Sequence, residues 1–392
     1  MSSRRQVCPG CSCLCDGLTI ENDSKIPVEA ANCSVGSAWF ANRSQPIESS
    51  TSRIAEVRTL LESASAPLIT GIENLTTETQ QAAVRVADRF STYIDSGLSN
   101  VGRGSMASFQ RYGKVTATLG EVASRSDLVV LWFCDPVTTH PRFIERFVRN
   151  SSGPKKRLIV IDETKTKTAE IADEFICVQA GNALSFIQQL RMSINADSEK
   201  DLAAELMDAK YGSVFVGNPK NVDSKFDVIT DQWFQLVSSL NDHTRFVMNS
   251  LRGDRNGIGA NNVLTSLCGF PNAIRFTENG PAYNGLEFST ASLIQRRDCD
   301  LLIACDIGNN DPFENCLDAK SIAWLKKIPV VVLSDLPANK YQTATVHIGT
   351  GTPGWTAVGD YVRMDNVPVP MSALAGTEVR IVLDLFNGLL SR

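Results

Sequence analysis

Five cysteines lie in the first 33 residues, and four of them have a spacing that suits metal binding. The segment "VCPGCSCLCDGL" spans 7–18, and the full pattern is Cys8-x2-Cys11-x3-Cys15, followed by Cys33. Four thiolates suit zinc and an iron–sulfur cluster equally well. The fifth, Cys13, would point to the opposite face if this stretch were extended. The alternative is that the cysteines are packing residues, kept after a metal was lost.

A second group of reactive side chains follows an apolar run, in "WFCDPVTTHPR" at 132–142. It supplies the carboxylate of Asp135, the imidazole of His140 and the guanidinium of Arg142. At the carboxyl end of a parallel strand, these groups could contact a cofactor or another phosphate-bearing ligand. The alternative is a loop closed by two prolines, with a surface histidine.

Several catalytic patterns are missing from the sequence. It has only three histidines, widely spaced, and neither H-x-H nor H-E-x-x-H occurs. A histidine-rich hydrolytic metal site within this chain is therefore not expected. There is no G-x-S-x-G nucleophile motif, and "GDRNGIGA" at 253–260 lacks the spacing of a dinucleotide or phosphate loop. The chain offers few candidates for a catalyst of its own.

Composition indicates a folded globular protein of two or three domains. The chain has 392 residues, of which 43% are hydrophobic and 21% charged, and a net charge of −5 without blocks of like charge. We therefore expect neither nucleic acid nor a membrane as a partner, and a cytoplasmic location. Eleven cysteines are an odd number, which argues against a disulfide framework. We expect the six outside the N-terminal group to be buried packing residues.

Short runs rich in β-branched residues predict strands that are buried on both faces. They are 66–72, 127–133, 157–162, 213–217, 245–249, 300–306, 329–335 and 345–349. Helical periodicity fills the gaps, as in 77–90, where Thr76 or Thr77 is the expected N-cap. Alternating strands and helices indicate an α/β fold with doubly wound, mostly parallel sheets.

Two segments repeat one pattern and suggest two related Rossmann-like halves. Each begins with an aspartate and an apolar strand, passes a Lys-Lys pair and a second strand, and ends with an aspartate, from Asp127 to Asp162 and from Asp300 to Asp335. Two unrelated β-α-β units would give the same pattern. We expect a Cys-rich segment at 1–50, α/β domains at 51–195 and 196–340, and a tail at 341–392 that packs back on the body. The polar stretch 195–210 is the expected connection between the halves.

Together these stretches resemble the B subunit of formylmethanofuran dehydrogenase, in the molybdopterin oxidoreductase superfamily. They resemble even more the B subunit of the related non-redox formyltransferase/hydrolase complex of bacteria. The resemblance covers nearly the whole chain, in the family's order. It rests on "CPGCSCLCDGL", "WFCDPVTTHPR", "RLIVIDETKTKTAEIAD", "LRGDRNGIGANNVLTSLCGFP", "GPAYNG" and "YVRMDNVPV". It implies a molybdopterin-oxidoreductase-like α/β fold, and a metal site at the four cysteines that holds a [4Fe-4S] cluster or zinc.

The chain departs from the dehydrogenase pattern at one position. Where the family carries the cysteine or selenocysteine that binds tungsten or molybdenum, this chain reads "NVGRGSM" at 100–106, which places Gly102 at the ligand position. A hydrogen side chain cannot bind a metal, so we expect no tungsten or molybdenum pterin. The alternative is a working dehydrogenase subunit whose pterin-bound metal has another ligand, and a third reading is a zinc-stabilised assembly protein.

The resemblance therefore implies a subunit without redox chemistry, which acts mainly as a scaffold. In the family, the non-redox complex moves a formyl group from tetrahydromethanopterin to a methanofuran-type carrier and releases it as formate. The transferase and the amidohydrolase-like zinc hydrolase lie in other subunits, which would be the partners of this chain. The scarcity of histidines noted above agrees with this division.

Overall fold

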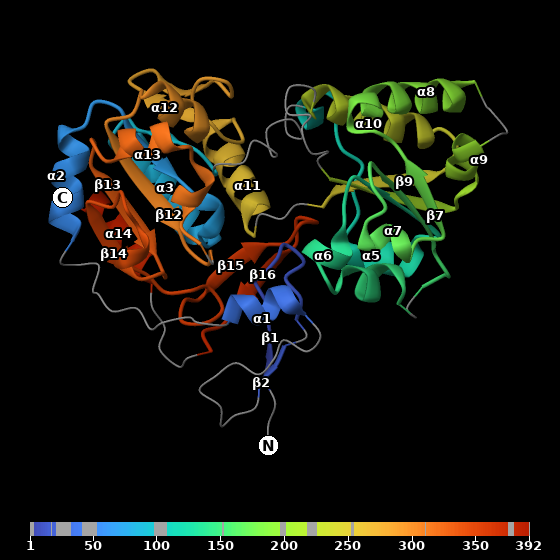
Figure 1. Cartoon of the computed structure of the whole chain (residues 1–392), viewed down its shortest axis with the longest axis horizontal. Coiled ribbons are helices and arrows are strands. Elements are labelled where there is room, and N and C mark those ends of the chain that lie inside the picture. The colour runs from blue at the N-terminus through green and yellow to red at the C-terminus, as the bar shows by residue number, and fades with distance from the viewer. Residues whose placement is uncertain are drawn as a thin grey trace. The chain divides into compact units, whose positions relative to one another are not determined.

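The computed structural model describes residues 4–16, 18–20, 33–40, 53–97, 108–150, 153–196, 201–217, 226–251, 255–309, 311–374 and 380–391. The chain divides into two compact units (Figure 1). Unit 1 takes 1–100, 254–363 and 368–392, and unit 2 takes 101–253 and 364–367. Each unit is described separately below.

Unit 1 is built on a seven-stranded sheet. Its order is β11 (Gly280–Tyr283), β10 (Ile274–Thr277), β4 (Tyr93–Ile94), β3 (Pro67–Thr70), β12 (Leu301–Asp306), β13 (Val330–Ser334) and β14 (Val346–Gly349). The strands from β4 to β14 are parallel, and β10 and β11 add an antiparallel hairpin at one edge. The central strands are buried on both faces, which explains their continuous apolar sequence.

Helices cover both faces of this sheet (Figure 1). One face, which includes Ile69 and Ile303, packs against α2 (Ile54–Ser63), α3 (Thr77–Arg89), α11 (Gly257–Cys268) and α14 (Ile381–Leu390). The other face, which includes Leu68 and Leu302, packs against α12 (Thr290–Arg296) and α13 (Ala319–Leu325). Neighbouring residues of one strand thus serve two cores, as the alternation of side chains along a strand requires.

The N-terminal segment of unit 1 packs against the C-terminal segment. The strand β1 (Arg4–Gln6) pairs with β2 (Leu18–Ile20), and β15 (Gly359–Val362) pairs with β16 (Pro368–Met371), both antiparallel. Leu14 is buried against Tyr361 of β15 and Met371 of β16. The side chain of Gln6 also donates to the carbonyl of Ser372 at 2.7 Å. These contacts fix the loop that carries the first four cysteines.

Unit 2 is built on a five-stranded, all-parallel sheet. Its order is β7 (Glu174–Cys177), β6 (Arg157–Asp162), β5 (Leu128–Trp132), β8 (Tyr211–Val216) and β9 (Arg245–Ser250). One face packs against α8 (Ala183–Asn195), α9 (Asp201–Asp208) and α10 (Phe226–Leu240). Four further helical segments of this unit are α5 (Leu119–Arg125), α6 (Pro136–Thr139), α7 (Lys167–Glu170) and a π-helical turn at Ile144–Val148.

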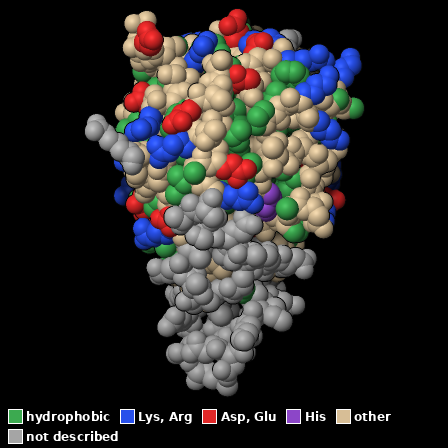
Figure 2. Space-filling view, turned by 90° about the vertical axis from the view of Figure 1, so that its left-hand side faces the viewer, with side chains coloured by type: hydrophobic (Ala, Val, Ile, Leu, Met, Phe, Trp, Pro, Cys, Tyr) green, Lys and Arg blue, Asp and Glu red, His purple; other side chains and the backbone are tan. Residues whose placement is uncertain are grey.

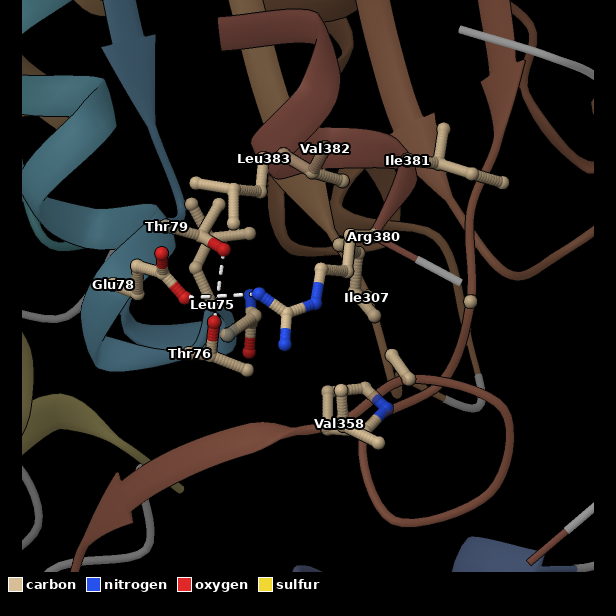
Figure 3. Close-up of a pocket in the computed structure, with 14 residues that line it drawn as sticks. Leu75, Thr76, Glu78, Thr79, Ile307, Val358, Arg380, Ile381, Val382 and Leu383 are labelled. Atoms are coloured by element: carbon tan, nitrogen blue, oxygen red, sulfur yellow. Dashed lines mark hydrogen bonds and ion pairs between the residues drawn. The ribbon is translucent and has the colours of Figure 1, made fainter. Parts of the chain in front are cut away.

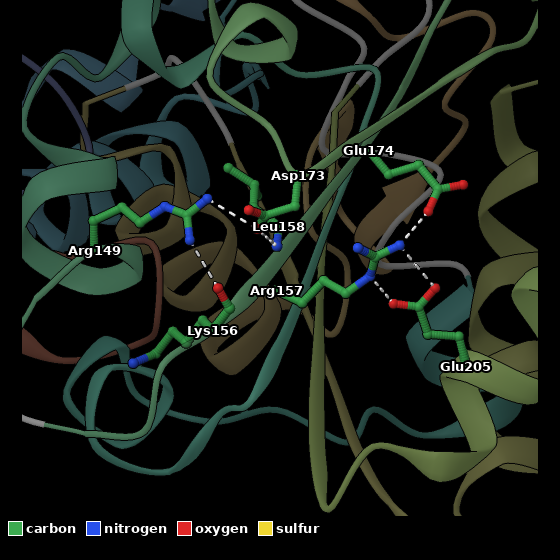
Figure 4. Close-up of polar contacts among 7 residues, drawn as sticks. All are labelled: Arg149, Lys156, Arg157, Leu158, Asp173, Glu174 and Glu205. Carbon is green, nitrogen blue, oxygen red and sulfur yellow. Dashed lines mark hydrogen bonds and ion pairs between the residues drawn. The ribbon is translucent and has the colours of Figure 1, made fainter.

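Ion pairs join three elements of unit 2 at the start of β6 (Figure 4). Arg157, the first residue of β6, pairs with Glu174 of β7 and Glu205 of α9. Asp173 accepts from Arg149 at 2.9 Å and from the backbone amide of Leu158 at 2.7 Å. Because these side chains are partly exposed, we expect each ion pair to add little to the free energy of unfolding.

The eight predicted strands are confirmed as β3, β5, β6, β8, β9, β12, β13 and β14. The helix predicted at 77–90 is α3, and its N-cap is Thr76. The N-terminal segment and α14 both lie in unit 1, where α14 packs onto α3 and α2. Four of the six other cysteines are buried as expected, but Cys177 and Cys316 are exposed.

The expected domain boundaries differ from the observed division. The boundary at 195/196 falls inside unit 2, and the boundary at 340/341 falls inside unit 1. The reason is strand pairing: β3, from the first hundred residues, pairs in parallel with β12, so distant parts of the chain complete one sheet. The stretch 195–210 likewise joins α8 to α9 inside unit 2 and does not connect the units.

The repeated segments do form equivalent β-α-β units, one in each unit. Asp127 precedes β5, and its carboxylate accepts from the backbone amides of Lys210 and Tyr211 at 3.0 and 2.9 Å. Asp300 precedes β12, and its carboxylate accepts from the amides of Ser65 and Ala66 at 2.7 and 2.9 Å. Each aspartate thus accepts from two amides at the start of the neighbouring parallel strand. The two repeated segments therefore share this hydrogen bonding as well as their topology.

Surface charge is mixed where it is visible. On the face drawn in Figure 2, acidic and basic side chains are both scattered over the described surface. Among the described residues, no helix combines the length and the apolar character that crossing a membrane requires.

The two strand-capping aspartates should matter for stability. We expect D300A, and equally D127A, to lower the free energy of unfolding by about 1–3 kcal/mol, because each leaves two backbone amides without their acceptor. D298A is the control, since the exposed Asp298 only pairs with Arg296 and should cost less than about 1 kcal/mol. Urea unfolding measures all three, and equal effects of D300A and D298A would contradict the capping role.

Candidate functional site

The N-terminal cysteines lie in a tight loop between β1 and β2. The amide of Cys8 donates to the carbonyl of Cys15 at 2.8 Å, which closes the loop. Inside it, the amide of Leu14 donates to the carbonyl of Cys11 at 3.2 Å, and Leu14 has a left-handed φ of 41°. Cys8, Cys11 and Cys15 are all buried. The loop therefore turns its sulfur atoms into the protein.

Cys33 reaches this loop from a different element. It directly precedes α1 (Ser34–Phe40), and its sulfur accepts from the backbone amide of Gly36 at 3.3 Å. The helix packs through Trp39 and Phe40 against Trp355 of the C-terminal segment. Because Cys8 belongs to the same apolar cluster, this packing holds Cys33 and α1 against the loop.

The four thiols lie near enough to influence one another. Burial raises the pKa of Cys8 above its ordinary value, and the charges of Cys11, Cys33 and Cys15 raise it further. Burial also raises the pKa of Cys33, with added contributions from Cys11 and Cys15. Without a cation, the thiols of Cys8 and Cys33 therefore stay protonated at neutral pH. A bound metal ion or cluster removes the penalty by stabilising the thiolates, so this donor set fits a metal.

The spacing of the four sulfur atoms also bears on which metal fits. Of these four residues, all within the described chain, no three bring their sulfur atoms within 4.8 Å of one another. Four sulfur atoms around a single zinc ion, with bonds of about 2.3 Å, would lie roughly 4 Å apart. In this arrangement the four sulfur atoms would have to move closer together before they could bind one zinc ion.

Cys13 does not take the position expected of an extended strand. Residues 11–14 form a turn, so Cys13 lies on the same side of the loop as its neighbours and is 2% exposed. Its thiol is hydrogen-bonded to those of Cys11 and Cys15, which raises its pKa. The site therefore contains five sulfur atoms.

Asp135 and His140 line a cavity of about 440 Å³ in unit 2, at the carboxyl ends of β5, β6 and β8. The carboxylate of Asp135 accepts from the amide of Thr168 at 3.0 Å and from the hydroxyl of Thr138 at 2.6 Å. The buried His140 bonds through Nδ1 to the hydroxyl of Thr139 at 2.9 Å. Arg142, the third predicted residue, is not part of the lining and pairs with Glu145 at 2.9 Å.

The charge of this cavity is acidic. Its described lining contains Asp135, Asp162 and Glu163, and no lysine or arginine. Burial raises the pKa of Asp162 despite backbone hydrogen bonds, and the nearby charges of Asp135 and Glu163 raise it further. These lining residues would repel a phosphate and attract hydrogen-bond donors or a cation.

Unit 1 has a larger cavity, of about 550 Å³, which the sequence did not reveal. It lies beside the carboxyl ends of β3 and β12, and Arg255 and Asp306 are among its lining residues. Arg255 donates to the side chains of Asn74 and Asn309 at 3.0 and 2.9 Å, and lies over the ring of Trp39 at 4.7 Å.

The carboxylate of Asp306 is fixed at the edge of this larger cavity. It accepts from the hydroxyl of Tyr341 at 2.6 Å and from the amide of Phe313 at 2.9 Å. Burial raises the pKa of Asp306, although these hydrogen bonds act against the shift. Its position at the end of a parallel strand is the signal that could have found it.

A third cavity in unit 1 is too small for an organic ligand. It measures about 40 Å³ and lies between α3, α14 and the residues before β15, where Arg380 faces Glu78 at 3.5 Å (Figure 3). That volume suits one or two water molecules.

The segment with Gly102 lies outside the described residues, so the expected loss of the tungsten ligand depends on the sequence.

The acidic cavity should give a pH-dependent stability. Because the pKa of Asp162 is raised on folding, the stability linked to its protonation is present at acid pH and lost as pH rises through the folded pKa. We expect D162N to be more stable than the wild type at pH 7, and the gain to shrink toward pH 4. D242N, which removes an exposed charge of the same unit, is the control. Urea unfolding measures both variants. A loss of stability in D162N at pH 7 would contradict the view that burial and the charges of Asp135 and Glu163 disfavour the Asp162 carboxylate.

The chain was compared with known proteins. No family model matches it. It is 28% identical to the B subunit of tungsten-containing formylmethanofuran dehydrogenase 2 from Methanococcus maripaludis, over 98% of this chain and 95% of that protein. The corresponding protein from Methanocaldococcus jannaschii is also 28% identical, over 94% of this chain and 92% of that protein.

Two solved structures share the fold. A chain of the formyltransferase/hydrolase complex from Methylorubrum extorquens, crystallised with methylofuran, matches with a TM-score of 0.72 and 18% identity, over 88% of this chain and 96% of that chain. Acetylene hydratase from Pelobacter acetylenicus matches with a TM-score of 0.61 and 11% identity, over 98% of this chain and 69% of that chain. The expected α/β, molybdopterin-oxidoreductase-like fold is confirmed. The expected resemblance is confirmed as well: the chain is similar over nearly its whole length to the B subunits of formylmethanofuran dehydrogenase.

Proposed function

We propose that this chain is the non-redox B subunit of a formyltransferase/hydrolase complex in tetrahydromethanopterin-linked one-carbon metabolism. In this reaction a formyl group passes to a methanofuran-type carrier and is released as formate. The observation that carries the proposal is Gly102, which stands where the resemblance places the tungsten or molybdenum ligand. A residue without a side chain donor cannot hold the metal on which the redox reaction depends.

The cavity in unit 2 supports the same proposal. A pterin dinucleotide carries phosphates, and the described lining of this cavity offers three carboxylates and neither lysine nor arginine to receive them. Asp135 and His140 remain our proposed ligand contacts there, through hydrogen bonds. Arg142 would need to leave Glu145 before it could join them.

The similarity to a chain of the formyltransferase/hydrolase complex also supports the proposal, through the fold and the share of that chain that is matched. The chain matched in the complex from Methylorubrum extorquens is covered almost completely, at 96%, whereas only 69% of acetylene hydratase is covered. Our chain thus has the extent of a subunit from an assembly that handles formyl groups. We propose amidohydrolase-like and formyltransferase subunits as its partners, with this chain mainly as their scaffold.

The N-terminal site is the proposed metal site. Cys8, Cys11, Cys15 and Cys33 would hold a [4Fe-4S] cluster or zinc. A cluster would supply electron transfer in a dehydrogenase, whereas in a scaffold it fixes the loop to α1. The chain's own contribution is the burial of the thiols and the amide of Gly36 on Cys33.

An active formylmethanofuran dehydrogenase subunit is the second candidate. Two observations favour it: both curated relatives are tungsten-containing dehydrogenase subunits, and the four cysteines are present in this chain. It would require a pterin-bound metal whose protein ligand is not at position 102.

The two candidates differ in what the purified complex does with a formylated substrate. We expect a complex isolated without oxygen, through a tag on this chain, to release formate from formyl-tetrahydromethanopterin when the carrier is added. We expect no reduction of viologen dyes with a formylated furan, because no tungsten or molybdenum is held where the formyl group would be oxidised. Viologen reduction at the rate of formyl consumption would instead establish the dehydrogenase. The control is the same preparation without the furan carrier.

A further inference from the structure

Cys13 is a fifth sulfur atom in a site that needs four. A single zinc ion or iron–sulfur cluster takes at most four cysteine ligands. Cys8, Cys11, Cys15 and Cys33 already supply that number, yet Cys13 is more deeply buried than any of them, at 2% exposure. The thiol of Cys13 is either a packing residue or a group that can bind the metal.

The turn at 11–14 decides which sulfur atoms Cys13 can approach. The hydrogen bond from Leu14 to the carbonyl of Cys11 reverses the chain, and Leu14 adopts a left-handed φ of 41°. As a result, the sulfur atoms of Cys13 and Cys11 lie within 4.8 Å of each other. The thiol of Cys13 is also hydrogen-bonded to both Cys11 and Cys15. It is therefore the neighbour of two of the ligands.

Cys8 and Cys33 are held by other contacts. The amide of Cys8 bonds to the carbonyl of Cys15 next to β1, and Cys33 precedes α1, with the amide of Gly36 on its sulfur. Cys13 lies two residues from each of Cys11 and Cys15, whereas Cys8 precedes the turn and Cys33 precedes a separate helix. A rotation of the Cys13 side chain could thus bring its sulfur to the place of Cys11 or Cys15 only.

We propose that Cys13 is a reserve metal ligand, which can replace Cys11 or Cys15 but neither Cys8 nor Cys33. The inference rests on the metal site of the proposed function. The exchange needs no redox step: the thiol of Cys13 loses its proton and binds the metal as a thiolate, and the departing thiolate takes up a proton and becomes a neutral thiol. Cys13 is at least as buried as the ligand that it replaces, so the number of buried thiolates around the metal stays the same.

The test compares matched variants of the full chain, purified without oxygen and reconstituted with ferrous iron and sulfide. Iron and sulfide retained per chain are measured after a challenge with an iron chelator, together with the visible absorption spectrum. We expect C13A to behave as the wild type, and C11A and C15A to keep their iron within roughly threefold of the wild type, with altered spectra. C11A/C13A, C15A/C13A, C8A and C33A should retain at least about tenfold less iron.

Two other results would overturn the inference, and they are distinguishable. If C11A loses as much iron as C11A/C13A, and C15A as much as C15A/C13A, Cys13 is a packing residue while the metal site stands. If the wild type itself retains neither iron nor zinc, the metal site of the proposed function fails as well. Thermal unfolding of each metal-free variant separates loss of a ligand from loss of the fold. If one single variant does not fold, the comparison of the other with its double variant still tests the role of Cys13.

Discussion

Burial of the N-terminal thiols is the constraint on which the rest of this account depends. Four cysteines, on a closed loop and beside α1, lie where their own charges would repel one another, and the three on the loop are buried away from water. Such a group is stable either as neutral thiols or around a cation. The loop is in turn fixed to β15 and β16 through Leu14 and Gln6. The two ends of unit 1 therefore meet at this site.

Much of the fold could be predicted from the sequence, because the central strands are buried on both faces and their apolar runs are continuous. β12 and β13 are examples, and the capping aspartates Asp127 and Asp300 mark the repeat. The short β4 and the hairpin β10–β11 escaped prediction, since their pairing depends on partners far away in the sequence. The domain boundaries failed for the same reason.

The candidate site could be predicted in part. The spacing of Cys8, Cys11, Cys15 and Cys33 indicated a shared site, but the turn that reverses Cys13 has no strong signal in "CSCLC", because Leu14 rarely adopts a left-handed φ. Asp135 and His140 line a cavity as the strand-end pattern suggests, whereas Arg142 is engaged with Glu145. A sequence pattern can place a residue at a sheet edge, but its partners decide where the side chain points.

The two cavities show how one architecture can serve different chemistry. Each lies at the carboxyl ends of a parallel sheet, where α/β proteins bind ligands. The described lining of each has three carboxylates, but the cavity in unit 1 also has Arg255, so it alone offers an anion an arginine partner.

Metal analysis of the wild-type protein tests the central claim most directly. Protein isolated without oxygen from its own source should contain iron and sulfide, or zinc, at the four thiols and less than about a tenth of an equivalent of tungsten or molybdenum per chain. One equivalent of tungsten or molybdenum per chain would contradict the account, because it would show that the metal is held without a cysteine at position 102.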